Sequence, residues 1–119
     1  MPHILIVDDE RAILALLSRA FSRAGFDVTL ANSAFDAMEF CNSKAFDAVL
    51  SDVDMPRMNG HELVRWIGDK HPRVRCALMS AFHIECEECP YVGRCHVLRK
   101  PFIPNDAIAL IRQMLTVPN

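Results

Sequence analysis

The sequence lacks the features that would place it in a membrane or on nucleic acid. No apolar run approaches the roughly 18 residues that span a bilayer, and the first run, residues 4–7, stops at two acids. Basic residues are not in excess, because 13 Lys and Arg stand against 15 Asp and Glu. No aromatic residues interleave with the basic ones, as a single-strand-binding surface would require. These absences predict a cytoplasmic protein with no direct nucleic-acid partner, no membrane partner and mostly reduced cysteines.

The chain also has no internal repeat, no low-complexity stretch and no Gly/Ser linker, which predicts a single domain over residues 1–119. Short apolar runs alternate with helical patterns along its whole length. The expected strands lie at residues 4–7, 27–31, 48–50, 76–79 and 96–98. Strands that alternate with helices at this spacing indicate right-handed crossovers, and therefore an α/β fold with a parallel sheet covered on both faces.

Four amphipathic patterns predict the helices. The first has an apolar face formed by Ile13, Leu16, Leu17, Ala20, Phe21 and Ala24, and it ends near Gly25. Ser33 is expected to cap the second helix, Gly60 to open the third, and Pro104 to lie in the first turn of the last. Between residues 80 and 96 the alternation calls for one more helix. Pro90 and Gly93 predict that it is short or irregular.

Polar side chains follow four of the five expected strands. Asp8 and Asp9 come after the first strand, Asp52 after the third, Ser80 after the fourth and Lys100 after the fifth. The carboxyl ends of parallel strands meet at one edge of a sheet, and ligands bind there. Each residue alone has an ordinary explanation as a turn former, a helix cap or a surface lysine. Their coincidence at four strand ends favours a common site.

The residue types in this set indicate phosphate chemistry. Three neighbouring carboxylates repel one another unless a cation lies between them, and hard oxygen ligands suit Mg²⁺, which completes its shell with water and phosphate oxygens. A lysine supplies a positive charge to a phosphoryl oxygen, and a serine supplies a hydroxyl donor. The set therefore predicts a site that receives a phosphoryl group on a carboxylate.

Four segments carry a family resemblance that covers essentially the whole chain. They are ILIVDDE at 4–10, AVLSDVDMPRMNG at 48–60, ALMSA at 77–81 and LRKPF at 98–102. In order and spacing they resemble the receiver domains of two-component response regulators. The resemblance implies a doubly wound, flavodoxin-like sheet with strand order 2-1-3-4-5. It also implies a signalling module rather than an enzyme.

The resemblance assigns a role to each residue of the set. Asp52 corresponds to the phosphoacceptor, with Ser80 and Lys100 contacting the phosphoryl group. Asp9 would bind Mg²⁺ directly, and Asp8 mainly through a coordinated water. Mg²⁺ would also contact Asp52 and the backbone carbonyl of Asp54, and the peptide bond between Lys100 and Pro101 would be cis. The implied donor is a phospho-histidine on a sensor histidine kinase or a histidine phosphotransfer protein, and the implied recipient of the signal is an effector protein or domain. Homodimerisation, which is common in the family, is left open.

Two departures from the family pattern concern how the signal is read out. The aromatic residue usual three positions before the lysine is replaced by Val97, whose branched side chain has few rotamers. The segment His83-x2-Cys86-x2-Cys89-x5-Cys95-His96 is unusually rich in potential metal ligands. Its spacing is compatible with zinc, an iron–sulfur cluster or a redox-active disulfide, and equally with thiols that pack as small apolar groups.

Two other functions compete with the signalling module. A phosphatase or phosphotransferase of the haloacid dehalogenase type also phosphorylates an aspartate in a DxD motif, and Asp52-Val53-Asp54 is of that form. Its nucleophile usually follows the first strand, however, and 119 residues leave no room for a substrate cap domain. A degenerate receiver would serve as an interaction, metal-binding or redox scaffold without phosphorylation. The complete acidic set argues against that reading, and Val97 keeps it open.

Overall fold

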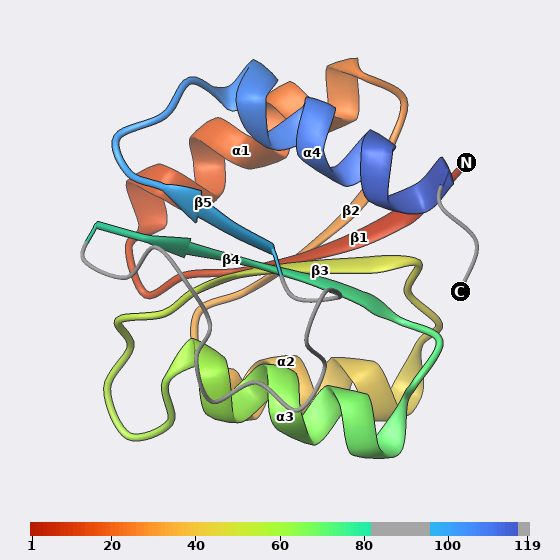
Figure 1. Cartoon of the computed structure of the whole chain (residues 1–119), viewed down its shortest axis with the longest axis vertical. Coiled ribbons are helices and arrows are strands. Elements are labelled where there is room, and N and C mark those ends of the chain that lie inside the picture. The colour runs from red at the N-terminus through yellow and green to blue at the C-terminus, as the bar shows by residue number, and fades with distance from the viewer. Residues whose placement is uncertain (82–95, 117–119) are drawn as a thin grey trace.

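The computed structural model describes residues 1–81 and 96–116. Strands and helices alternate, as the sequence predicts (Figure 1). In chain order they are β1 (His3–Val7), α1 (Arg11–Arg23), β2 (Asp27–Ala31), α2 (Ala34–Ser43), β3 (Ala48–Asp52), α3 (Gly60–Lys70), β4 (Arg75–Ser80), β5 (His96–Arg99) and α4 (Pro104–Thr116). No helix in these described ranges is long and apolar enough to cross a membrane.

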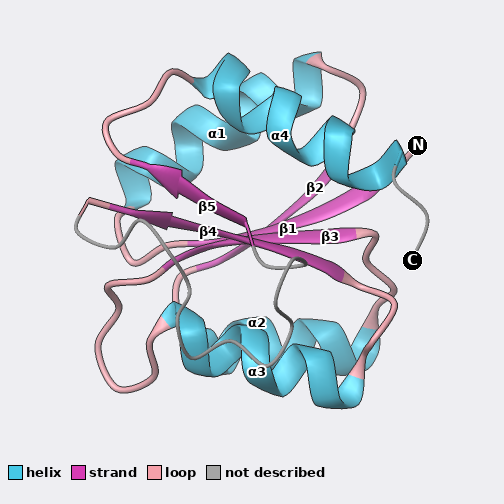
Figure 2. Cartoon of the chain, in the orientation of Figure 1, coloured by secondary structure: helices cyan, strands magenta, loops and turns pink. Residues whose placement is uncertain are grey.

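The five strands form one parallel sheet in the order β2-β1-β3-β4-β5, which confirms the predicted topology. Helices α1 and α4 cover one face of the sheet, and α2 and α3 cover the other (Figure 2). β1, β3 and β4 lie inside the sheet between these layers, and their side chains are almost fully buried. Burial on both faces explains why these strands appear in the sequence as continuous apolar runs.

Local signals set the ends of the helices. The Ser33 hydroxyl accepts a hydrogen bond from the Asp36 amide and caps α2, as predicted. Asn59 and Glu62 form a reciprocal capping box at the start of α3. Gly25 follows α1 with a φ of 95°, a left-handed conformation that glycine adopts without strain.

The inward face of α1 matches the predicted one except at Leu16, because Ile13, Leu17, Ala20, Phe21 and Ala24 all pack against the core. Leu14, Leu17 and Phe21 are buried, whereas Leu16, predicted to face the core, is 53% exposed. Leu14 and Leu16 both fall at helical spacing from other residues of this face, so periodicity alone does not show which of the two is buried. The choice depends on how α1 packs against β1, β2 and α4, which are tertiary contacts.

Candidate functional site

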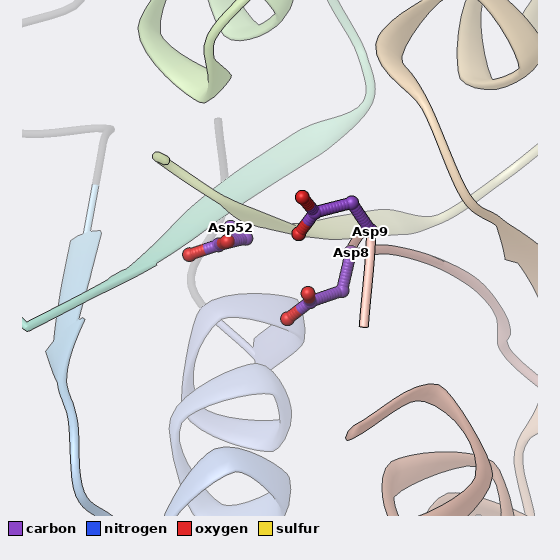
Figure 3. A group of neighbouring side chains, drawn as sticks. All are labelled: Asp8, Asp9 and Asp52. Carbon is purple, nitrogen blue, oxygen red and sulfur yellow. The ribbon is translucent and has the colours of Figure 1, made fainter. Parts of the chain in front are cut away.

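The predicted polar residues lie at the carboxyl ends of the central strands. Asp8 directly follows β1, Asp52 ends β3 and Ser80 ends β4, while Lys100 follows β5. Because β1, β3 and β4 are neighbours in register, their ends bring these side chains to one edge of the sheet. Figure 3 shows Asp8, Asp9 and Asp52 with their carboxylates gathered there.

Asp8, Asp9 and Asp52 are close enough to share a cation. Each offers one carboxylate oxygen, and these three oxygens lie within 4.8 Å of one another. Asp8 and Asp52 are buried and Asp9 is exposed, so the group opens to solvent on one side. In the described part of the chain, no other group of three or more His, Cys, Asp or Glu side chains meets this criterion.

The chemistry of Asp8 fits a bound Mg²⁺ ion. Its Oδ1 accepts a hydrogen bond of 2.9 Å from the Glu10 amide. Its Oδ2 is buried and accepts no hydrogen bond within the described ranges. A buried carboxylate oxygen without a hydrogen-bond partner is costly, and a hard divalent cation is a suitable partner for it. The three carboxylates therefore fit the predicted metal.

Lys100 neutralises part of this acidic group. Its Nζ lies 3.2 Å from Asp52 Oδ1, with a hydrogen bond, and 3.5 Å from Asp8 Oδ2. The Lys100 amide also donates to the Ser80 carbonyl at 2.8 Å, which ties the lysine to the end of β4. One ammonium group thus faces two buried carboxylates, and Asp9 adds a third negative charge.

Burial dominates the electrostatics of the two inner carboxylates. It raises the pKa of Asp8 to about 6, against the lowering effect of the Glu10 amide, and the charge of Asp52 raises that pKa further. Burial also raises the pKa of Asp52, although Lys100 opposes the shift. For Lys100, burial acts to lower the pKa, but the charges of Asp8 and Asp52 outweigh it and the pKa is raised. The site therefore holds more negative charge than Lys100 can compensate.

The remaining predicted residues border this group. Ser80 is fully buried at the end of β4, and Asp54 is exposed in the loop after β3. The peptide bond between Lys100 and Pro101 is cis, as the family resemblance implies.

Gly60 holds α3 against the strand that carries Asp52, a role that the sequence does not reveal. A Cβ atom at Gly60 would lie 2.5 Å from the Asp52 carbonyl oxygen and 2.9 Å from Val53 Cα. The Gly60 amide donates to the Val53 carbonyl at 3.0 Å. The glycine therefore lets the start of α3 approach the Asp52 backbone. In the sequence pattern Gly60 indicates only the start of a helix.

The two predicted departures from the family have different outcomes. Val97 lies in β5, half-buried against the core and paired with Leu78. His83, Cys86, Cys89 and Cys95 lie outside the described residues, while His96 is exposed at the start of β5. The zinc, iron–sulfur and redox hypotheses for that segment have no support in the described structure and stay predictions.

Comparison with known sequences gives a consistent result. The family model for the response regulator receiver domain matches residues 4–112. The chain is 31% identical over 115 residues to the DNA-binding transcriptional regulator NtrC of Escherichia coli K12, covering 95% of this chain and 24% of NtrC. It is 34% identical over 110 residues to the response regulator protein FleR of Pseudomonas aeruginosa, covering 91% and 23%. The chain thus spans about a quarter of the length of these relatives.

Solved structures share the fold. A CheY-like receiver domain from Methanospirillum hungatei superposes with a TM-score of 0.87 at 24% identity, covering 97% of this chain and 94% of that one. The chemotaxis response regulator CheY4 of Vibrio cholerae has a TM-score of 0.85 at 26% identity, covering 96% and 98%. TrrA of Thermotoga maritima, solved in complex with Mg²⁺–BeF, has a TM-score of 0.86 at 24% identity, covering 96% and 99%. The chain belongs to the response regulator receiver domains of two-component systems, a family in which aspartate phosphorylation and Mg²⁺ binding are general.

Proposed function

We propose that this chain accepts a phosphoryl group on Asp52 from a phospho-histidine and thereby changes its affinity for an effector. The donor is a sensor histidine kinase or a histidine phosphotransfer protein, and the effector is a separate protein or another domain of the same chain. We propose that the receiver unit extends over residues 1–119 and works in the cytoplasm. The observation that carries the proposal is the position of Lys100 Nζ, 3.2 Å from Asp52 Oδ1 and 3.5 Å from Asp8 Oδ2.

In the proposed reaction, a carboxylate oxygen of Asp52 attacks the phosphorus of the phospho-histidine. The new O–P bond forms as the N–P bond breaks, and the imidazole leaves with the bonding electron pair and takes up a proton. Lys100 stays beside Asp52 and balances charge on the transferred group, and the Ser80 hydroxyl donates to another phosphoryl oxygen. Mg²⁺ held by Asp8, Asp9, Asp52 and the backbone carbonyl of Asp54 would neutralise further phosphoryl charge.

Phosphorylation with a small donor tests the proposal. Incubation with Mg²⁺ and acetyl phosphate should add one phosphoryl mass to the intact protein, and Asp52→Asn should abolish the increment. The matched control is Asp54→Asn, which removes the same charge two residues away and keeps the backbone carbonyl. It should still be labelled. Absence of labelling in the unsubstituted protein, under conditions that label another receiver, would refute the proposal, and many turnovers per chain would indicate an enzyme.

A second candidate function is a receiver that binds its partners without phosphorylation. Val97 favours it, because a half-buried valine has no ring to turn between inward and outward positions. Amide NMR spectra recorded before and after labelling separate the two candidates. Shifts that spread along β5 and α4 support the phosphorylation switch. Labelling with shifts confined to the acidic site would favour the scaffold.

A further inference from the structure

A second concave site lies at the end of the sheet opposite Asp52. It is a cleft of about 590 Å³ beside the first residues of β3 and β4. Both strands begin on the right-hand side of the view in Figure 1. Residues 44–47, between α2 and β3, form one wall, and residues 71–75, which follow α3 and end at the first residue of β4, form the other. Leu115 near the end of α4 also lines it. None of these residues takes part in the phosphoacceptor site.

The cleft gathers positive charge in a chain whose net charge is −2. Lys44, Arg73 and Arg75 line it, and Asp47 is the one acidic residue among the lining residues of the described structure. Asp47 Oδ2 already accepts a hydrogen bond of 2.8 Å from the His3 amide. Neither Lys44 nor Arg73 pairs with a carboxylate in residues 1–81 or 96–116. Because the cleft focuses these charges on a small volume, it favours an anion.

Hydrogen bonds between the two walls, within one wall and to α4 hold the cleft in shape. The Arg75 amide donates to the Asp47 carbonyl at 3.2 Å, and the Arg75 guanidinium donates to the Met114 carbonyl near the end of α4. The Val74 amide donates to the His71 carbonyl at 3.1 Å. The cleft therefore exists before any ligand arrives, which lowers the entropic cost of binding.

The remaining lining is apolar. Phe46 and Cys41 are buried beneath the cleft, and Val74 and Leu115 are half-buried beside it. The volume falls within the range of about 300–1,000 Å³ typical of small-molecule sites. We propose that this cleft binds a small organic anion, with its phosphate or carboxylate group among Lys44, Arg73 and Arg75 and its apolar body against Phe46 and Leu115.

The proposed site shares no residue with the phosphoacceptor site. β3 separates the two sites by its full length of five residues, which is roughly 15 Å of extended chain. At this distance a change of one charge at Asp52 acts on the cleft much more weakly than the positive charges that line it. The cleft should therefore bind its ligand equally well in the Asp52→Asn variant, and the proposal can fail or succeed separately from the phosphoacceptor function.

Phenyl phosphate is a suitable probe, because it joins a dianionic group to an apolar ring and is not a phosphodonor of the acetyl phosphate type. Titration in EDTA, followed by amide NMR, should shift resonances of residues 41–47 and 71–75 and of Leu115, with inorganic phosphate binding more weakly and phenol more weakly still. Phenylacetate tests whether a carboxylate replaces the phosphate, and its binding at the same residues equally supports the site. The double variant Lys44→Gln/Arg73→Gln should raise the Kd for phenyl phosphate about tenfold.

The matched control is Arg23→Gln/Lys70→Gln, which removes two exposed positive charges that do not line the cleft. Its Kd should stay within about twofold of that of the unsubstituted chain. An equal loss in both double variants would overturn the proposal, because it would reflect overall charge alone. Phenol binding as tightly as phenyl phosphate would also overturn it. The proposal would also be overturned if an acidic peptide shifted the resonances of these residues while phenyl phosphate and phenylacetate did not.

Discussion

In the absence of metal, the buried charge of Asp8 should lower the free energy of unfolding relative to a variant with a neutral residue at this position. Asp8 Oδ2 is buried without a hydrogen bond, and burial raises the pKa of the carboxyl group to about 6 from 3.8. A difference of about two pKa units corresponds to about 3 kcal/mol between the charged and neutral forms. The substitution Asp8→Asn removes the charge and keeps the shape of the side chain.

The size of the effect depends on pH. Because the folded state holds the Asp8 proton more tightly, the unfolded chain loses its proton first as the pH rises from about 4 to about 6. Unfolding of the unsubstituted chain becomes easier over this interval, whereas Asp8→Asn does not titrate. The variant should gain about 1 kcal/mol at pH 4.5 and about 3 kcal/mol at pH 7.5, both relative to the unsubstituted chain.

Urea unfolding in EDTA, followed by the fluorescence of Trp66, the only tryptophan, measures this difference. Asp9→Asn is the matched control: it makes the same change in charge at the adjacent, exposed carboxylate, so its effect should be smaller. Mg²⁺ should then stabilise the unsubstituted chain more than Asp8→Asn. An Asp8→Asn variant that is no more stable than the unsubstituted chain at pH 7.5 would refute this reasoning. An Asp9→Asn variant that raises the free energy of unfolding as much as Asp8→Asn does would also refute it, because burial of Asp8 would then not explain the effect.

Two further predictions follow from buried contacts. Gly60→Ala should lower the free energy of unfolding in urea by about 1–3 kcal/mol, because the new Cβ would lie 2.5 Å from the Asp52 carbonyl oxygen. The same substitution should slow phosphorylation of the chain by acetyl phosphate. An unchanged urea midpoint would contradict this close approach. Burial raises the pKa of Cys41 to about 11. In a variant with Cys76 replaced by alanine and Cys86, Cys89 and Cys95 by serine, Cys41 is the one remaining thiol and should react slowly with Ellman's reagent at pH 8. Its rate should rise about tenfold per pH unit toward pH 11, and fast reaction of the folded chain at pH 8 would show that Cys41 is accessible.

Much of the fold could be predicted because the local sequence patterns of its strands and helices agree with their positions in the structure. The buried strands β1, β3 and β4 appear as continuous apolar runs, and their observed bounds extend the predicted ones by at most two residues. One position of the inward face of α1 could not be predicted, because Leu14 and Leu16 both fit the helical period and only the packing of α1 against β1, β2 and α4 separates them.

The candidate site was predictable for a different reason. Parallel strands deliver the residues that follow them to one edge, so the order of the strands along the chain is enough to bring Asp8, Asp52 and Lys100 together. Their unequal burial could not be predicted, since the sequence presents Asp8 and Asp9 as equivalent neighbours while the fold buries only the first. The basic cleft was not predicted, although the residues that precede β3 and β4 are likewise brought to one end of the sheet, where Lys44 and Arg75, 31 positions apart in the chain, line it together.

The position of Lys100 at the end of an edge strand has a dynamic consequence. Asp8 and Asp52 are held by central strands with partners on both sides, whereas β5 has four residues and, within residues 1–81 and 96–116, pairs with β4 alone. We expect the amides of β5 to exchange with solvent through local opening, and those of β1 and β3 only through larger unfolding. Opening of β5 would withdraw the Lys100 ammonium group from Asp8 and Asp52. By reciprocity, the ion pairs that Lys100 makes with these carboxylates oppose the opening of β5, so the charge of the acidic site and the local stability of this edge strand are thermodynamically linked.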